Sequence, residues 1–245
     1  MRIHLFRLVG CLALATSVAC GSRDEPRQPA PRTELAGIDR TGAANQLPER
    51  GSGALIVVLG DSLTAGLGLA TDEAYPAVLQ EHLEAKGLKY QVINAGISGD
   101  TSAGGLSRLD WALEGDVRIL VVALGANDGL RGLPVPQLKS NLATIIERAQ
   151  RRGIEVVLAG MEAPPNWGAD YTRAFHDVYP ALAKEYKVAL VPFLLEGVAG
   201  INQLNQRDGI HPTAQGDRIV ADTVWSVLEP IAARLAVRSE GASGS

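Results

Sequence analysis

Three residues of this sequence have the side chains that serine-based acyl transfer requires. Ser62 follows the apolar run 55–59, at a place where the chain must turn out of a strand. A serine hydroxyl is a weak nucleophile until a neighbouring base removes its proton. His211 can supply that base, and Asp208, three positions earlier on a Gly-containing turn, can fix its tautomer and stabilise the imidazolium. We therefore interpret Ser62, His211 and Asp208 as nucleophile, base and orienting carboxylate.

Each of these residues also has an ordinary structural interpretation. A serine at a strand-to-helix turn commonly caps the helix. Asp208 and His211 fit a loop turn that leads into a helix with Pro212 at its first position. The other three histidines lie in the apolar N-terminal stretch and on two predicted helices, where they are surface or structural residues. The catalytic interpretation therefore depends on Ser62, His211 and Asp208 occurring together.

Acyl transfer also needs donors for the negative charge that develops on the carbonyl oxygen. Removing one such donor typically raises the barrier by about 2.7 to 4 kcal/mol. Three candidates are the backbone N–H of Ser62, the backbone N–H of Gly99 and the side-chain amide of Asn127. Each lies in a short Gly-containing segment that directly follows a predicted strand. We interpret them together as an oxyanion hole.

Short β-branched apolar runs alternate with amphipathic stretches along the chain, which predicts a mostly parallel sheet covered by helices on both faces. In such α/β sheets, ligands bind outside the carboxyl ends of the strands. The candidate residues would therefore meet at one sheet edge. The predicted strands are 54–59, 90–94, 117–124, 154–159 and 188–191, and the predicted helices cover 74–86, 101–114, Pro136 to Gly153, 170–187 and a final segment containing 220–235.

Four separated motifs resemble those of the SGNH, or GDSL, hydrolase family: 60–63 (GDSL), 96–102, 125–128 and 208–212. The resemblance covers Ala54 to Leu235 and is closest to the bacterial branch of acyl-CoA thioesterases, lysophospholipases and arylesterases. It implies a three-layer α/β/α sandwich with no metal or organic cofactor. It further implies that Ser62, Gly99, Asn127 and His211 match the four name-giving positions and Asp208 the third triad member. Asp61 and Asp128 are expected to hold the loops.

The N-terminal residues differ in composition from the rest of the chain. Residues 1–19 combine early basic residues with a short apolar run, which predicts a signal peptide. Cys20 is then the one cysteine left in the mature chain, and we expect it to carry a lipid; ordinary signal cleavage without lipidation is the alternative. Residues 20–53 are rich in Pro, Arg, Glu, Gln and Gly, which predicts a flexible tether. The hydrolase domain is expected at 54–237, before a disordered tail at 238–245.

Composition and charge indicate which classes of partner and which cellular location to expect. The 245-residue chain has a formal net charge of −4 and no basic stripe, so nucleic acid is excluded as a partner. We expect an exported protein, either periplasmic or anchored in a membrane through Cys20, that acts on a small acyl ester. The sequence leaves the oligomeric state open.

The substrate is less well defined than the reaction. Leu130–Leu133 and Met161–Trp167 are predicted to flank the site and to line an apolar groove. Carboxylic esters and lysophospholipids are favoured over thioesters, because an exported enzyme meets little cytosolic acyl-CoA. Two alternatives stay open: a carbohydrate O-deacetylase of the same family, and a surface lipoprotein that uses an inactive hydrolase fold for binding.

Overall fold

The structure is a computed structural model that describes the backbone of residues 53–243 and the side chains of residues 53–238. The predicted signal peptide, the lipidation site at Cys20 and all of the predicted tether except Gly53 lie outside the described residues. None of the helices between residues 53 and 243 is both long enough and apolar enough to cross a membrane.

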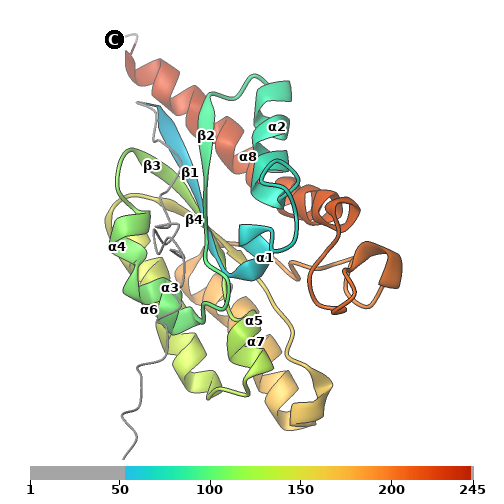
Figure 1. The fold of residues 1–245 in the computed structure, drawn as a ribbon. Coiled ribbons are helices and arrows are strands. Elements are labelled where there is room, and N and C mark those ends of the chain that lie inside the picture. Colours follow the sequence, from blue (N-terminus) through green and yellow to red (C-terminus); the bar gives the residue numbers. More distant parts are fainter. Residues whose placement is uncertain (1–52, 244–245) are drawn as a thin grey trace, which may run out of the picture. The chain divides into compact units, whose positions relative to one another are not determined.

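Five parallel strands form one sheet in the order β2-β1-β3-β4-β5 (Figure 1). The three central strands β1, β3 and β4 are mostly apolar and buried, because helices cover both faces of a parallel sheet, whereas the edge strands β2 and β5 are partly exposed. The predicted number and direction of the strands are confirmed. The strands are β1 (Ala54–Gly60), β2 (Tyr90–Gly96), β3 (Val117–Ala123), β4 (Glu155–Ala159) and β5 (Ala189–Val191).

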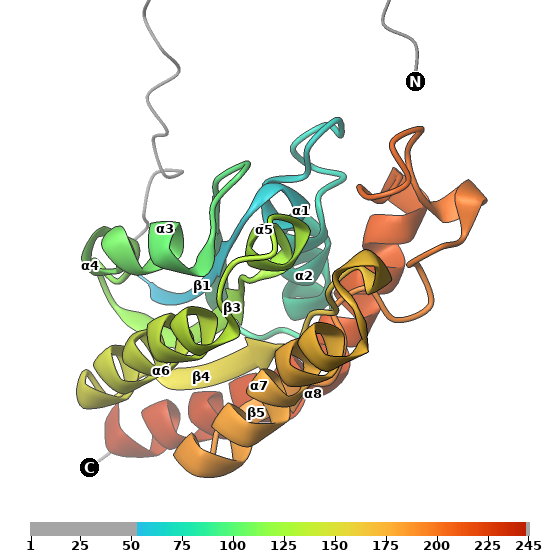
Figure 2. The same ribbon diagram turned by 90° about the horizontal axis from the view of Figure 1, so that it is seen from below.

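Helices cover the sheet in two groups. On one face α2 (Tyr75–Ala85) packs beside α8 (Ala214–Ser243). The other face carries α3 (Ser102–Ser107), α4 (Leu109–Ala112), α6 (Val135–Arg151) and α7 (Ala169–Tyr186), with α6 and α7 side by side (Figure 2). Two short helices, α1 (Ser62–Ala65) and α5 (Ala126–Leu130), and two 3₁₀ turns, Pro165–Trp167 and Asn202–Leu204, complete the described elements. This arrangement is the predicted three-layer α/β/α sandwich.

Two helix predictions need correction. The helix expected over 101–114 is divided at Arg108, whose φ and ψ of −108° and 10° separate α3 from α4. The last helix begins at Ala214 and not at Pro212, and it continues to Ser243, past the boundary expected at 237. The apolar periodicity stops near Leu235 because packing against the sheet stops there, whereas the following residues still tolerate a helical backbone.

A buried carboxyl group joins the two helices on the α2 side of the sheet. Asp217, in the first turn of α8, is 1% exposed, and its Oδ2 accepts a hydrogen bond of 2.9 Å from the backbone N–H of Tyr75 at the start of α2. Burial raises the pKa of Asp217 to about 7, while the Tyr75 N–H opposes that change. The native state therefore holds this proton more tightly than the unfolded chain.

We expect Asp217→Asn to flatten the pH dependence of stability. Because the folded pKa is raised, Asp217 lowers the free energy of unfolding as pH rises from about 4 to about 7. Asparagine can keep the bond from Tyr75 without a buried charge, so the variant should be more stable than the wild type at pH 8, by about 1 to 3 kcal/mol, and similar at pH 4. Urea unfolding at both pH values measures this, with the exposed Asp177→Asn as control. Lower stability of Asp217→Asn at pH 8 would contradict the prediction.

Candidate active site

The candidate residues lie where the strand order reverses. In the sheet, β2 lies on one side of β1, and β3 lies on its other side. The loops that follow β1 and β3 therefore diverge over opposite faces of the sheet. Ligand sites of open α/β sheets form in the crevice at such a point. Ser62 lies two residues after the end of β1, and Asn127 lies four residues after the end of β3. The predicted meeting of these segments at one edge is therefore a consequence of the topology.

A tight turn presents Ser62 at the end of β1. Asp61 caps the four-residue helix α1, and its Oδ1 accepts a hydrogen bond of 3.1 Å from the N–H of Leu63. The helix lies so close to β2 that a Cβ on Gly96 would stand 2.3 Å from the backbone nitrogen of Ala65. Only glycine permits this approach. As the first residue of α1, Ser62 has a backbone N–H without an intrahelical acceptor.

His211 lies between Ser62 and Asp208. Its Nε2 is 2.8 Å from Ser62 Oγ, and its Nδ1 is 2.7 Å from Asp208 Oδ2. The other carboxylate oxygen of Asp208 accepts the backbone N–H groups of Ile210 and His211 at 2.9 and 3.0 Å. The hydrogen bonds from the Ile210 N–H, the His211 ring and the His211 N–H lower the pKa of Asp208 to about 2. Asp208 is therefore ionised and accepts a hydrogen bond from the imidazole.

The loop that carries His211 is fixed to the Ser62 turn by Gln206. Its backbone N–H donates to the carbonyl of His211 at 2.7 Å, and its side-chain amide donates to the carbonyls of Leu67 and Pro212 at 2.7 and 2.9 Å. An isolated antiparallel bridge between Asn205 and Pro212 closes the loop. These contacts hold the imidazole over Ser62.

The amide of Asn127 lies between the other two motifs. Its Nδ2 donates to the carbonyl of Asp100 at 2.9 Å and lies 3.4 Å from Asp61 Oδ2. Gly99 adopts a φ of +84°, which a glycine accepts readily, in a turn closed by a hydrogen bond from the Asp100 N–H to the Ile97 carbonyl. Within the described part of the chain, the N–H of Gly99 donates no hydrogen bond. The structure thus places the Asn127 amide next to Asp100, which follows Gly99, and next to Asp61, which precedes Ser62.

Two buried aspartates hold these loops. Burial raises the pKa of Asp61 to about 6, against the opposing effect of its hydrogen bonds to Leu63 and Asn127. Asp128 accepts the backbone N–H and the hydroxyl of Ser102 at 2.7 and 2.6 Å, which ties the loop after β3 to the start of α3. Asn141 of α6 adds a hydrogen bond of 2.9 Å to the same hydroxyl. These contacts agree with the loop-holding roles expected of Asp61 and Asp128.

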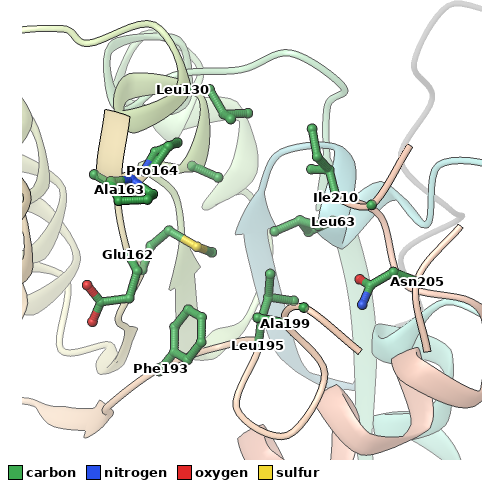
Figure 3. Close-up of a pocket in the computed structure, with 15 residues that line it drawn as sticks. Leu63, Leu130, Glu162, Ala163, Pro164, Phe193, Leu195, Ala199, Asn205 and Ile210 are labelled. Atoms are coloured by element: carbon green, nitrogen blue, oxygen red, sulfur yellow. The ribbon is translucent and has the colours of Figure 1, made fainter. Parts of the chain in front are cut away.

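An apolar cavity of about 360 Å³ opens beside the Ser62 turn (Figure 3). Leu63 and Ile210, the neighbours of Ser62 and His211, form one wall, and Leu130 lies across from them. Glu162 contributes to the lining, but its carboxylate is turned to His176 Nδ1 at 2.6 Å. The remaining lining residues are Ala126, Met161, Ala163, Pro164, Pro165, Phe193, Leu195, Ala199, Gly200, Asn205 and Gly209. The cavity therefore begins one residue from the candidate nucleophile.

The predicted groove residues line only part of this cavity. Leu130 and the segment 161–165 are in place, whereas Trp167 packs against Gly132 outside the lining. The segment 193–200 was missed, because its scattered apolar residues follow no helical or strand period. Among the described side chains, no group of three or more His, Cys, Asp or Glu residues is arranged to hold a metal ion.

Residues 58–219 match the model of the GDSL-like lipase/acylhydrolase family. The chain belongs to this family. It is 45% identical over 186 residues to esterase TesA of Pseudomonas aeruginosa, an alignment that covers 76% of this chain and 92% of TesA. Thioesterase 1/protease 1/lysophospholipase L1 of Escherichia coli K12 is 40% identical over 177 residues, covering 72% and 84%. Membership makes the protein an ester hydrolase.

Solved structures of the family have the same architecture. AlinE4, described as an SGNH-hydrolase family esterase, superposes with a TM-score of 0.62 at 45% sequence identity, covering 74% of this chain and 98% of AlinE4. The resemblance inferred from the four motifs is thereby confirmed, as are the fold class and the esterase class. The matched residues 58–219 contain every residue of the predicted triad and oxyanion hole.

Proposed function

We propose that this GDSL-family hydrolase is an exported serine esterase with Ser62 as nucleophile, His211 as general base and Asp208 as the residue that orients the base. The observation that carries the proposal is the chain of two hydrogen bonds, 2.8 Å from Ser62 Oγ to His211 and 2.7 Å from His211 to Asp208. A nucleophile in contact with a base that a third group orients is the recognised geometry for acyl transfer.

The reaction proceeds through an acyl-enzyme. His211 Nε2 takes the proton of Ser62 Oγ as the oxygen attacks the ester carbonyl carbon, and Asp208 stabilises the imidazolium. The N–H groups of Ser62 and Gly99 and the amide of Asn127 hold the oxyanion. The ester C–O bond then breaks, and His211 gives its proton to the departing alkoxide. Water, deprotonated by His211, next attacks the acyl carbon, and Ser62 leaves with a proton as the carboxylic acid is released.

The cavity supports acyl esters as the substrate class. Its lining is apolar apart from Glu162 and Asn205, and it starts beside Ser62, so a chain on the acyl side of the bond enters it directly. Each buried methylene contributes about 0.8 kcal/mol to binding. Aryl esters, lysophospholipids and thioesters present the same carbonyl and differ in the leaving group.

The N-terminal residues support export and lipidation. The proposal is that residues 1–19 are removed as a signal peptide, that Cys20 carries a lipid, and that residues 20–53 link it to the hydrolase domain. The protein would then act at a membrane surface or in the periplasm. Mass spectrometry of the mature N-terminus tests this, and an unmodified terminus leaves a periplasmic or secreted enzyme.

We expect medium-chain esters to be the best substrates in a series of p-nitrophenyl esters from acetyl to palmitoyl. The value of kcat/KM should rise by about three- to fourfold for each methylene that the cavity buries and then level off. Steady-state kinetics on the mature protein measures this, with a fluorophosphonate probe to count active sites. A maximum at acetyl would favour the O-deacetylase alternative, and inertness toward every ester and the probe would favour a binding protein.

A further inference from the structure

Arg108 lies at the junction of the three loops that build the oxyanion site. Its side chain is 12% exposed, and all three guanidinium nitrogens donate hydrogen bonds. Nε donates to Asp100 Oδ2 at 2.6 Å, Nη1 to the carbonyl of Ala95 at 2.8 Å and Nη2 to the carbonyl of Gly60 at 2.8 Å. One planar group therefore joins the end of β1, the end of β2 and the residue after Gly99.

The three acceptors border the residues proposed to do the chemistry. Gly60 lies two positions before Ser62, and its carbonyl also accepts the backbone N–H of Ile97 at 3.1 Å, where the Gly99 turn begins. Asp100 follows Gly99 directly, and its carbonyl accepts the amide of Asn127. The hydrogen bonds of Arg108 thus fix the positions of three groups relative to one another: the Ser62 N–H, the Gly99 N–H and the Asn127 amide.

Geometry and burial argue that this role needs arginine in particular. A guanidinium holds its donors in a fixed planar fork, whereas a lysine ammonium is a single charge on a flexible stem. Bringing a cation into a nearly buried place is costly unless it is paired and its donors are satisfied, and Arg108 meets both conditions. Its position between α3 and α4, where the helix predicted over 101–114 is interrupted, directs the side chain toward the sheet edge.

We infer that Arg108 is a positioning residue for catalysis, which holds the Gly99 turn against the Ser62 turn so that the oxyanion donors are aligned before substrate binds. The inference rests on the proposed serine mechanism and adds to it a residue outside the family motifs. Arg108 need not touch the substrate. A displacement of about 1 Å at a reacting centre can cost about 10²-fold in rate, and loss of one oxyanion donor costs about 10²- to 10³-fold.

The test compares Arg108→Met and Arg108→Lys with the wild type on p-nitrophenyl butyrate, with active sites counted by fluorophosphonate titration. We expect kcat per titrated site to fall about 10²-fold in Arg108→Met and about tenfold in Arg108→Lys, with KM changed less than about twofold. A matched control is Arg152→Gln, because Arg152 also bridges a carboxylate, Asp110, and a carbonyl, that of Leu113, away from the site. This control should keep the wild-type kcat.

A second readout separates positioning from a loss of folded protein. Butylboronic acid forms a bond from Ser62 Oγ to boron and places a boronate oxygen toward the oxyanion donors, so its inhibition constant reports their alignment. The constant should rise in Arg108→Met in proportion to the fall in kcat/KM. If the variant has fewer titratable sites but the wild-type kcat per site and the wild-type inhibition constant, Arg108 is merely structural and the inference is wrong.

The double variant Asp100→Asn/Arg108→Met tests the electrostatic alternative. If Arg108 acts only by neutralising the Asp100 carboxylate, removing both charges should restore kcat. We expect no restoration, because the carbonyls of Gly60 and Ala95 would still lack their hydrogen bonds from the guanidinium. Restoration would overturn the inference while leaving the serine mechanism intact, whereas full activity of Ser62→Ala would overturn the mechanism itself, whatever the Arg108 variants show.

Discussion

Substitution of Ser62 by alanine should lower kcat/KM for p-nitrophenyl butyrate by about 10⁴- to 10⁶-fold. The reason is that the hydroxyl 2.8 Å from His211 is the atom proposed to form the acyl-enzyme, and alanine has no nucleophilic group in its place. The oxyanion donors and the apolar cavity stay in place, so a small activity above the uncatalysed rate should persist. Steady-state kinetics on the variant and on the wild type measures the loss.

A serine on α3 provides the matched control. Ser107 of α3 donates its hydroxyl to the carbonyl of Gly104 at 2.7 Å on an exposed surface. Ser107→Ala should keep wild-type activity and bind the fluorophosphonate probe, whereas Ser62→Ala should not bind it. Retention of more than about a tenth of the activity in Ser62→Ala would show that another residue is the nucleophile.

The sequence predicted the strands and the meeting of the motifs for one physical reason. A parallel sheet brings the carboxyl ends of its strands to one edge, so Ser62 after β1 and Asn127 after β3 must be neighbours there. His211 is different, because it follows no strand and lies on a loop before α8. Its position over Ser62 depends on Gln206, whose bonds to Leu67 and Pro212 no local pattern indicates.

Residues that support the site from a distance could not be found by the same reasoning. Arg108 is one arginine in a region predicted as continuous helix, and its three acceptors are known only when the loops are placed. Ser102 and Asn141 complete the contacts of Asp128 in the same way. The four motifs mark the reacting groups and two residues that hold the loops, Asp61 and Asp128, whereas Arg108 and Asn141 lie outside the motifs and are recognisable only from tertiary contacts.

The length of the last helix shows a related limit. Apolar periodicity reports the part of a helix that packs against the sheet, and it ends near Leu235. The helix itself continues to Ser243, because its backbone hydrogen bonds need no apolar face. The domain boundary predicted at 237 therefore lies near the end of the packed region, whereas the helix continues beyond it.

The substitution Asp208→Asn should lower kcat by about 10⁴-fold, because it reverses the imidazole tautomer. Asparagine can keep its carbonyl on the backbone N–H groups of Ile210 and His211, which places its amide N–H₂ against His211 Nδ1. That nitrogen must then accept a hydrogen bond from the amide, so the neutral imidazole carries its hydrogen on Nε2 and cannot take the proton of Ser62. In serine proteases the equivalent aspartate-to-asparagine change has an effect of this size. Single-turnover acylation kinetics with p-nitrophenyl butyrate measures the acylation step directly.

Because the pKa of Asp208 is lowered to about 2, the prediction also specifies how the activity depends on pH. Its carboxylate is ionised throughout pH 5 to 8, so protonation of Asp208 cannot contribute to the wild-type profile in that range, and the wild type should exceed the variant at every pH tested. Asp222→Asn is the matched control, because Asp222 contacts His82 Nε2 at 3.0 Å on the surface of α8, in a pair without a serine. The control should retain full activity. If Asp208→Asn loses less than about tenfold, the carboxylate only shapes the loop and His211 is oriented by its backbone contacts alone.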